Sequence, residues 1–245
     1  MRRIRIYYTG NLSTGLTVML DAGASHHLLQ VLRKKAGERF IMFNGHGGEF
    51  DATLISANKK TACVEIGEWH QRIVESEISI HLGQAISRGE RMDYAIQKAV
   101  ELGVFAITPL LTEYCQVQLS ENRIDKRVAH WQAIAISAAE QSGRCVVPVV
   151  HLPISFDQWI LQDAALKVIC CPRQEKNALV NVKSVSKIKS VVLAIGAEGG
   201  FSDQEVRCAM QKNFVSFSLG PRILRTETAT VVALTLLQSQ FGDIN

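Results

Sequence analysis

Two arginines and a glutamate lie in one short connection near the end of the chain, at residues 219–229. The connection follows a strand-like run and precedes a helical pattern, so its side chains would lie beside the free N–H groups of a helix N-terminus. A helix cap explains Thr226, and Glu227 suits the positive end of the helix dipole. Neither effect explains Arg222 or Arg225, because positive charge is unfavourable there. This connection is therefore the best candidate for a functional site.

Glycines mark two further candidate loops. Residues 196–200 (Gly-Ala-Glu-Gly-Gly) follow a buried strand-like run and open a capped helix, which is where ligands bind in α/β proteins. An ordinary turn explains these glycines equally well. Residues 45–48 (Gly-His-Gly-Gly) lie between two strand-like runs and are interpreted as a hairpin turn. The chain lacks G-x-G-x-x-G and G-K-[ST] motifs, so a nicotinamide oxidoreductase is the least favoured enzyme class.

Histidine and cysteine are not arranged for metal binding. His26 and His27 are neighbours in sequence, which do not share a helix face, so packing or a phosphate contact is favoured. The six cysteines form no C-x-x-C pair, and Cys170 and Cys171 end an apolar run typical of a strand core. We expect no metal, and reduced thiols in a cytoplasmic protein.

The positive charge is concentrated at the front of the chain. The net charge is +4, and residues 1–72 hold ten Lys and Arg against six Asp and Glu, whereas residues 73–245 hold seventeen of each. A basic front segment suits docking to a polyanion such as RNA, although charge alone fits a chance distribution equally well. No apolar run approaches the roughly 20 residues of a membrane span, and no signal peptide is expected.

The two parts of the chain predict different folds. Residues 1–72 contain short strand-like runs at 5–8, 17–20, 39–43, 49–56 and 61–67, and one helix at 26–35 with Ser25 as its N-cap. This content predicts a small β-barrel.

In residues 73–245 strands and helices alternate, which predicts an α/β domain with a mainly parallel sheet. Ser202 and Glu205 form a capping-box pattern before one of its helices. Strands are predicted at 79–85, 104–110, 166–171, 191–195 and 216–219, and helices at 91–102, 124–142, 202–211 and 227–241.

The glycine loops also carry a resemblance. Residues 195–202 (Ile-Gly-Ala-Glu-Gly-Gly-Phe-Ser) resemble the I-G-P-E-G-G-F-S motif of the ribosomal RNA small subunit methyltransferase E family, and residues 219–229 are similar to its second signature. Ala197 stands where the family usually has proline, which should loosen the turn. Tyr114-Cys115 replaces the more usual Arg-Ser, so no role of that arginine is carried over. Further matching blocks lie at 5–7, 26–28, 31–33, 37–38, 92–93, 97–104 and 138–144.

The resemblance implies a SPOUT-type parallel sheet with a C-terminal trefoil knot (residues 73–245), preceded by a PUA-like β-barrel that binds RNA (residues 1–72). It implies a homodimer that uses S-adenosyl-L-methionine to methylate N3 of a uridine in 16S rRNA, in the 30S subunit. Methylation of another RNA, at a tRNA base or a ribose, is an alternative. A non-catalytic RNA-binding protein is another.

Site residues follow from the resemblance and from the chemistry of the loops. Arg225 or Arg222 would stabilise charge on the uracil oxygens, and Glu227 would take the N3 proton, although it equally suits the helix dipole. Cofactor contacts are expected from Ile195, Gly196, Glu198, Gly199, Gly200, Leu219, Gly220, Ile223, Leu224, Thr228 and Ala229. RNA phosphate contacts are expected from Arg2, Arg3, Arg5, His27, Arg33, Lys34 and Lys35.

Overall fold

The computed structural model describes residues 4–58, 61–115, 121–171 and 188–244, except the side chains of 121 and 122. The chain divides into two compact units. Unit 1 comprises residues 1–75 and 139–147, and unit 2 comprises residues 76–138 and 148–245. The sequence predicted one division after residue 72 and gave no sign that a later segment belongs with the front of the chain.

Unit 1 is built on a sheet of five strands, β1 (Arg5–Tyr7), β2 (Thr17–Met19), β3 (Arg39–Phe43), β4 (Glu49–Ala57) and β5 (Ala62–His70). Their order is β1-β3-β4-β5-β2. β1 is parallel to β3, and the other neighbours are antiparallel. Alternate residues such as Phe40, Met42 and Leu54 face one apolar core. Residues 45–48 connect β3 to β4 as a hairpin turn, which confirms that prediction.

The helix of unit 1 differs from the one predicted at residues 26–35. An α-helix, α1, occupies Ala22–His26, and a π-helical turn, η1, follows at His27–Val31. The N-cap is the side chain of Asp21, so the prediction of Ser25 as N-cap was wrong.

Ser25 is buried, and its hydroxyl makes tertiary hydrogen bonds instead of capping the helix. Its hydroxyl donates to the carbonyl of Leu20 and accepts from the N–H of Ala62, both at 3.1 Å. A serine before an apolar run predicts a cap from local sequence alone. The competing partner on β5 is 37 residues away.

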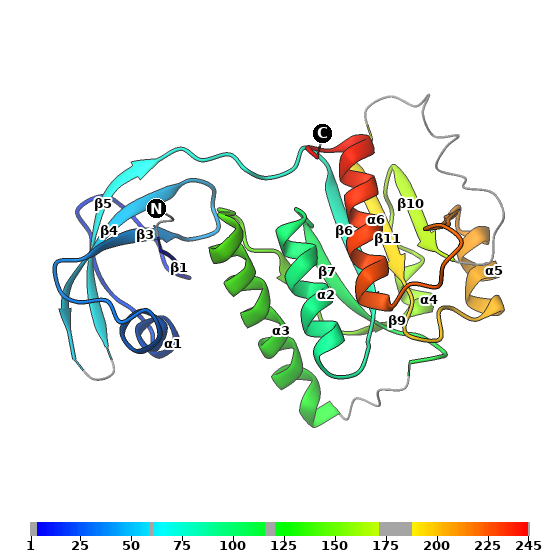
Figure 1. Ribbon diagram of the computed structural model, residues 1–245, viewed down its shortest axis with the longest axis horizontal. Helices are drawn as coiled ribbons and strands as arrows, with labels where there is room; N and C mark the ends of the chain where they lie inside the picture. Colours follow the sequence, from blue (N-terminus) through cyan, green and yellow to red (C-terminus); the bar gives the residue numbers. More distant parts are fainter. Residues whose placement is uncertain (1–3, 59–60, 116–120, 172–187, 245) are drawn as a thin grey trace. The chain divides into compact units, whose positions relative to one another are not determined.

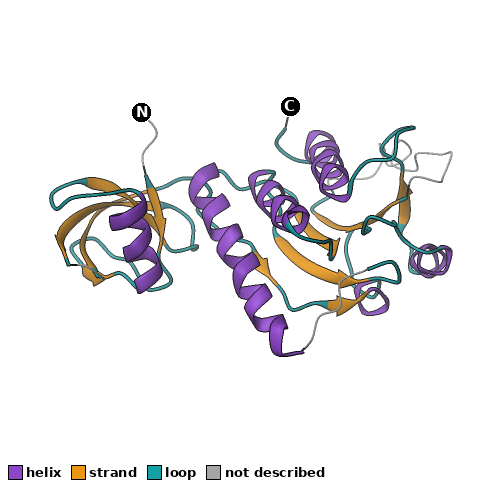
Figure 2. Ribbon diagram, turned by 60° about the horizontal axis from the view of Figure 1, so that its bottom comes forward, coloured by secondary structure: helices purple, strands orange, loops and turns teal. Residues whose placement is uncertain are grey.

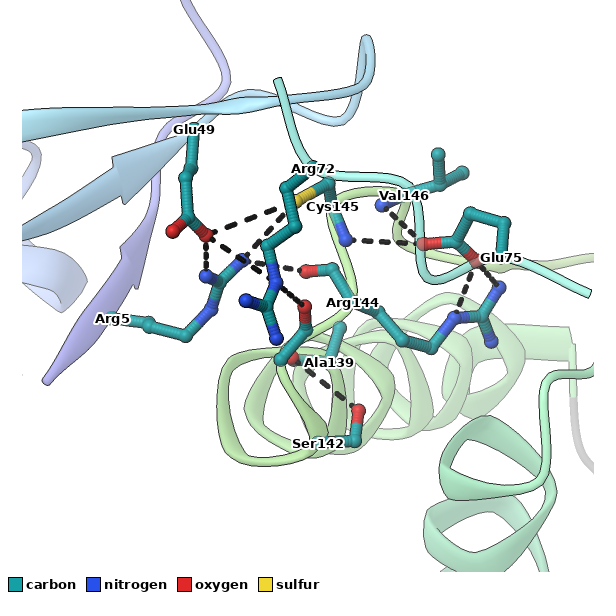
Figure 3. A network of polar contacts seen from close by, with 10 residues as sticks. Arg5, Glu49, Arg72, Glu75, Ala139, Ser142, Arg144, Cys145 and Val146 are labelled. Carbon is teal, nitrogen blue, oxygen red and sulfur yellow. Dashed lines mark hydrogen bonds and ion pairs between the residues drawn. The ribbon is translucent and has the colours of Figure 1, made fainter. Parts of the chain in front are cut away.

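The last turn of helix α3 (Glu121–Ser142) belongs to unit 1, where arginines hold it (Figure 3). Arg5 pairs with Glu49 of β4, and its Nη2 donates to the carbonyl of Arg144 at 3.0 Å. Arg72 Nε donates to the carbonyl of Gly143 at 3.0 Å. The carbonyls that follow a helix C-terminus lack partners within the helix, so guanidinium groups stabilise this end.

A glutamate completes this network (Figure 3). Glu75 accepts hydrogen bonds from Arg144 Nε at 2.7 Å and from the N–H groups of Cys145 and Val146, both at 3.1 Å. Residues 144–146 are therefore fixed to the end of the front segment by several charge-assisted hydrogen bonds.

Unit 2 contains a sheet of seven strands, and each pairing described in it is parallel. The order is β12-β10-β11-β6-β7-β8, with β9 also on β7. This confirms the predicted α/β fold with a mainly parallel sheet. The strands are β6 (Ser79–Ala85), β7 (Ala106–Leu111), β8 (Val149–Val150), β9 (Ile154–Ser155), β10 (Leu166–Cys170), β11 (Ser190–Ile195) and β12 (Val215–Phe217).

Helices cover both faces of this sheet (Figures 1 and 2). Helices α2 (Glu90–Glu101) and α6 (Thr226–Phe241) pack against each other on one face. Helices α4 (Phe156–Trp159) and α5 (Asp203–Gln211) lie on the other. There Trp159 packs so closely on β6 that a Cβ at Gly83 would lie 2.4 Å from its ring. No helix in the described ranges is long and apolar enough to span a membrane.

The starts of α5 and α6 test two predicted caps. Ser202 and Glu205 form a complete capping box at α5, which confirms that prediction. The N-cap of α6 is Arg225, without a side-chain hydrogen bond, so Thr226 is not the cap. The hydroxyl of Thr226 donates to the carbonyl of Gly196, at 2.7 Å.

Candidate active site

A cavity of about 620 Å³ opens at the carboxyl ends of β10, β11 and β12. The three strands are parallel neighbours, so the segments that follow them meet at one edge of the sheet, where ligands bind in α/β folds. The loop after β11 (residues 196–202) and the loop after β12 (residues 218–225) form most of its wall. These are the two loops that the sequence singled out.

The glycines of the first loop are required by its geometry. A Cβ at Gly196 would lie 2.8 Å from the backbone carbon of Gly200, and one at Gly199 would lie 2.9 Å from Tyr114 Cβ. Gly200 has a φ of +74°, and its N–H donates to the carbonyl of Ala197 at 2.9 Å. The loop is therefore a tight turn. Gly196 and Gly199 leave no space for a side chain, and Gly200 has a backbone conformation that other residues rarely adopt.

Nearly all the predicted cofactor residues line this cavity. The exception is Thr228, which is exposed on α6 and lies outside the cavity lining. The lining includes Ile195, Gly196, Glu198, Gly199, Gly200, Leu219, Gly220, Ile223, Leu224 and Ala229.

Sequence reasoning missed other walls of the cavity. Phe201, Val206 and Phe217 add apolar surface, and Asp203 and Arg207 add charge. The missed signal is positional, because Phe201 directly follows the glycines that were noticed and Asp203 lies two residues further on.

Cys170 and Cys171 also line the cavity, from the end of β10. Burial, and secondarily Cys171, raises the pKa of the Cys170 thiol. Cys170 therefore stays protonated and acts as part of an apolar wall. This agrees with the prediction of a strand core and gives no sign of a redox centre.

Glu198 is turned toward helix α2. Its carboxylate accepts from Arg91 Nη1 at 2.7 Å and weakly from the N–H of Arg88 at 3.4 Å. Burial acts to raise the pKa of Glu198, but hydrogen bonds from its own N–H, Arg91 and Arg88 outweigh burial and lower it. Glu198 is thus a charged residue that ties the glycine loop to the start of α2.

Comparison with known proteins gives a consistent result over both units. A model described as an RNA methyltransferase domain matches residues 74–238, and one described as an RNA methyltransferase PUA domain matches residues 20–67. The ribosomal RNA small subunit methyltransferase E of Buchnera aphidicola (subspecies Schizaphis graminum) is 37% identical over 98% of each chain. The chain belongs to the ribosomal RNA small subunit methyltransferase E family.

Solved structures agree with this assignment. A putative methyltransferase from Legionella pneumophila, in complex with S-adenosylmethionine, has a TM-score of 0.94 at 41% identity and covers 99% of this chain and 100% of its own. A ribosomal RNA small subunit methyltransferase E from Neisseria gonorrhoeae, bound to S-adenosyl methionine, has a TM-score of 0.90 at 37% identity over 100% of both chains.

The three predicted catalytic residues of this methyltransferase occupy different positions. Arg222 lines the cavity, whereas Arg225 is exposed at the start of α6 and lies outside the lining. Glu227 is the second residue of α6 and also lies outside the lining, and its Oε2 is buried without a hydrogen-bond partner in the described structure. A buried carboxylate oxygen without a partner is unfavourable for folding alone, so Glu227 stays a candidate for a role toward the substrate.

Arg5 does not suit the predicted contact with RNA phosphate. Its side chain is 7% exposed and is held by Glu49 and the carbonyl of Arg144. The guanidinium serves the end of α3 in unit 1, and an RNA phosphate would have to break an ion pair to reach it. We therefore correct this prediction and assign Arg5 a structural role.

The other described basic residues predicted to bind RNA lie at the start of η1 and directly after it. Arg33 is exposed with a φ of +52°, Lys35 is exposed, and His27 is half-buried. Lys34 Nζ pairs with Glu38 at 3.0 Å. Hydrogen bonds from the N–H of Lys35 and from Lys34 lower the pKa of Glu38, which keeps a negative charge on this surface. Arg2 and Arg3 lie outside the described residues.

Among the described residues there is no group of three or more His, Cys, Asp or Glu placed to hold a metal ion. Arg144, which the sequence analysis matched to the family, is buried against Glu75 and lies outside the cavity lining.

Proposed function

We propose that this methyltransferase transfers the methyl group of S-adenosyl-L-methionine to N3 of a uridine in 16S rRNA. The observation that carries the proposal is the cavity of about 620 Å³, which the two family loops close over three parallel strand ends. Relatives named for the small-subunit RNA, and structural neighbours bound to S-adenosylmethionine, support the substrate and the cofactor.

The cavity suits the cofactor in size and chemistry. Pockets for ligands of this size span about 300–1,000 Å³ and combine apolar walls with few polar anchors. Leu219, Leu224 and Phe201 supply apolar walls, and the glycines at 196 and 199 let backbone groups approach a ligand closely. When bound, S-adenosyl-L-methionine supplies an electrophilic methyl group. The loops hold it while the acceptor base is aligned.

Uridine N3 carries a proton and is a poor nucleophile until that proton is removed. A group of the protein must therefore accept the proton. Glu227 would accept this proton on its carboxylate, whose Oε2 has no hydrogen-bond partner in the described structure. Arg225 is exposed beside the start of α6 and would donate to the uracil oxygens as negative charge develops on them. The target base would have to leave its stack to reach these groups.

Unit 1 would bind the phosphate backbone of the RNA. The PUA domain match covers residues 20–67, which include the exposed Arg33 and Lys35 and the Lys34–Glu38 pair. Phosphate contacts from such residues give affinity and orientation without reading sequence. The basic front of the chain thus supports docking to 16S rRNA, in our proposal within the 30S subunit in the cytoplasm.

Finer features of the fold follow from the family assignment. We propose that unit 1 closes as a PUA-like barrel, that unit 2 contains a C-terminal trefoil knot, and that two chains form a homodimer. The contact of Thr226 with Gly196 ties the last loop to the preceding one, as expected where a chain end passes close to an earlier loop. Helix α6 keeps a partly exposed apolar stripe, which supports the dimer.

The test is a methylation assay with product identification. Purified protein is incubated with methyl-labelled S-adenosyl-L-methionine and small ribosomal subunits from a strain that lacks the homologous activity. Nuclease digestion and mass spectrometry then identify the product, and naked 16S rRNA is assayed in parallel. We expect N3-methyluridine at one site. The control is Gly196→Val, whose side chain would collide with the backbone of Gly200.

Other outcomes separate the alternatives. Label in a tRNA base or in a ribose would keep the methyltransferase and overturn its target. Cofactor binding without label in any RNA would favour a non-catalytic RNA-binding protein.

A further inference from the structure

A buried chain of hydrogen bonds links the two cofactor loops to the sheet. Gln84 at the end of β6 donates from Nε2 to Thr226 Oγ1 at 2.9 Å, and Thr226 Oγ1 donates to the carbonyl of Gly196 at 2.7 Å. Thr230, one turn further along α6, places its Oγ1 2.6 Å from Gln84 Oε1. Gln84 and Thr230 are 0% exposed and Thr226 is 4% exposed.

The carbonyl of Gly196, at the end of this series of hydrogen bonds, fixes which atom donates in each of them. The carbonyl of Gly196 only accepts, so the single proton of the Thr226 hydroxyl points to it. Thr226 Oγ1 must then accept from the amide nitrogen of Gln84, which leaves Gln84 Oε1 to accept from Thr230. Buried bonds that polarise one another in this way rigidify the groups they join.

The chain ends at the glycine turn that forms one wall of the cavity. Gly196 cannot move far, because the turn closes on itself through the bond from the N–H of Gly200 to Ala197 and leaves no space for a Cβ. Its carbonyl is turned toward α6 by Thr226. One hydroxyl group therefore links the turn to the start of α6, directly after the loop that follows β12.

Helix formation alone does not require this hydroxyl. Thr226 is the first residue of α6, and the N-cap before it is Arg225, which makes no side-chain capping bond. Thr235 on the same helix provides a comparison, because its hydroxyl donates to the carbonyl of Val231 within α6, at 2.8 Å. Thr235 is therefore a matched control for Thr226, because among the described residues its hydroxyl makes a hydrogen bond only within the helix.

We propose that Thr226, held by Gln84, is a positioning residue that fixes the two cofactor loops against each other and so sets the affinity for S-adenosyl-L-methionine. This inference rests on the proposed function. Thr226 also lines the cavity, but its hydroxyl proton is held by the carbonyl of Gly196, so it acts through that turn and takes no part in proton or methyl transfer.

The experiment compares Thr226→Val, which keeps the shape and removes the hydroxyl, with Thr226→Ser, which keeps the hydroxyl. Calorimetric titration with S-adenosyl-L-methionine gives the Kd, thermal unfolding gives Tm, and the methylation assay gives kcat at saturating cofactor. Loss of one buried hydrogen bond should raise the Kd of Thr226→Val about tenfold. We expect kcat within about threefold of wild type, Thr226→Ser near wild type, and Thr235→Val without any change in Kd.

A second variant covers the case in which Thr226→Val fails to fold. Gln84→Met removes the donor to Thr226 but leaves its bond to Gly196 possible, so we expect a smaller rise in Kd, about threefold. Unchanged Kd in both variants, with only Tm lowered, would show a purely structural role and overturn the inference. A wild-type protein that does not bind S-adenosyl-L-methionine at all would overturn the proposed function as well.

Discussion

The two arginines of the loop after β12 differ in position, and their functions should differ accordingly. Arg222 lines the cavity, whereas Arg225 is exposed outside it. Removing a donor that acts only on developing charge lowers kcat by about 10²-fold and leaves ground-state binding intact. We therefore predict that Arg225→Ala loses about 10²-fold in kcat with little change in the Kd for S-adenosyl-L-methionine.

Arg222→Ala is the matched comparison for that variant and should raise the Kd of the cofactor. Single-turnover methylation at saturating RNA, combined with calorimetric titration, separates the two effects. Equal turnover of wild type and Arg225→Ala under these conditions would contradict the role given to Arg225.

A second prediction concerns Glu227, because substitution can distinguish a role as proton acceptor from a role as a partner of the helix dipole. If its unpartnered carboxylate takes the N3 proton, Glu227→Gln should lower kcat by about 10²-fold or more. If it only complements the helix dipole, the variant should lose less than about 1 kcal/mol of stability and keep its turnover. We expect the first result in a methylation assay with saturating substrates.

The control for Glu227→Gln is Glu90→Gln. Glu90 is an exposed acidic residue in the first turn of α2, so it shares the helix-dipole position of Glu227 but not its buried, unpartnered oxygen. A comparable loss of kcat in both variants would remove the argument for Glu227 as a base.

Among the elements, β6 carries a histidine that should make stability depend on pH. His81 lies between Thr108, at 2.9 Å from its Nε2, and the ring of Trp159, with centroids 4.8 Å apart. Burial, and secondarily the charge of His151, lowers the pKa of His81 from 6.5 to about 4. The folded protein therefore binds fewer protons than the unfolded chain between these pH values.

Stability should consequently fall as the pH falls from about 6.5 toward 4, by about 1–3 kcal/mol in total. We would measure the free energy of unfolding in urea by circular dichroism between pH 7.5 and 4.5. The slope of this free energy against pH should be smaller in His81→Gln. His46→Gln, at an exposed turn of unit 1, should keep it. A wild-type slope retained in His81→Gln would show that another group is responsible.

The local sequence pattern was sufficient to predict those elements whose structure depends mainly on residues close in sequence. The strands at 39–43 and 79–85 were predicted with the bounds that the structure has, since β-branched and alternating runs specify them. The helix predicted at 26–35 exists but begins at Ala22 and ends at Val31, and its start was misplaced because Ser25 contacts a distant strand instead of capping. β8 and β9 were missed, since two residues hold no periodicity.

The candidate site was predictable in part for a related reason. The glycine loops carry motifs that can be read along the chain, and they do form one cavity. The wall from Cys170 and Cys171 could not be predicted, because it depends on β10 lying beside β11 and β12. The role of Arg5 at the end of α3 depends on contacts more than a hundred residues apart.

At the scale of the whole molecule, helix α6 is an element that a single chain leaves incompletely covered. Its buried side faces α2 through residues such as Ala233 and Leu237. Ala229, Val232 and Leu236, at i, i+3 and i+7, form a second apolar stripe, and Leu236 remains 45% exposed. A helix that is apolar on more than one side is normally covered on each of them.

A second copy of the chain is the partner that we propose for this stripe, and Ala229 also lines the cavity. The subunit interface would then begin at the edge of the active site, so that disrupting it should impair methylation as well as assembly. We predict that the wild type sediments at twice the chain mass of 27.1 kDa. Leu236→Arg should sediment as a monomer, because a buried arginine without a partner opposes association.

Leu161→Arg provides the control, since Leu161 is 65% exposed beyond α4 and outside the stripe. It should remain a dimer with normal turnover, whereas Leu236→Arg should lose most of its methylation while its thermal unfolding stays cooperative. Sedimentation and activity measured at the same micromolar concentrations would connect the two properties. A wild-type monomer with full activity would leave the stripe without a role in catalysis and would contradict the homodimer as the working form.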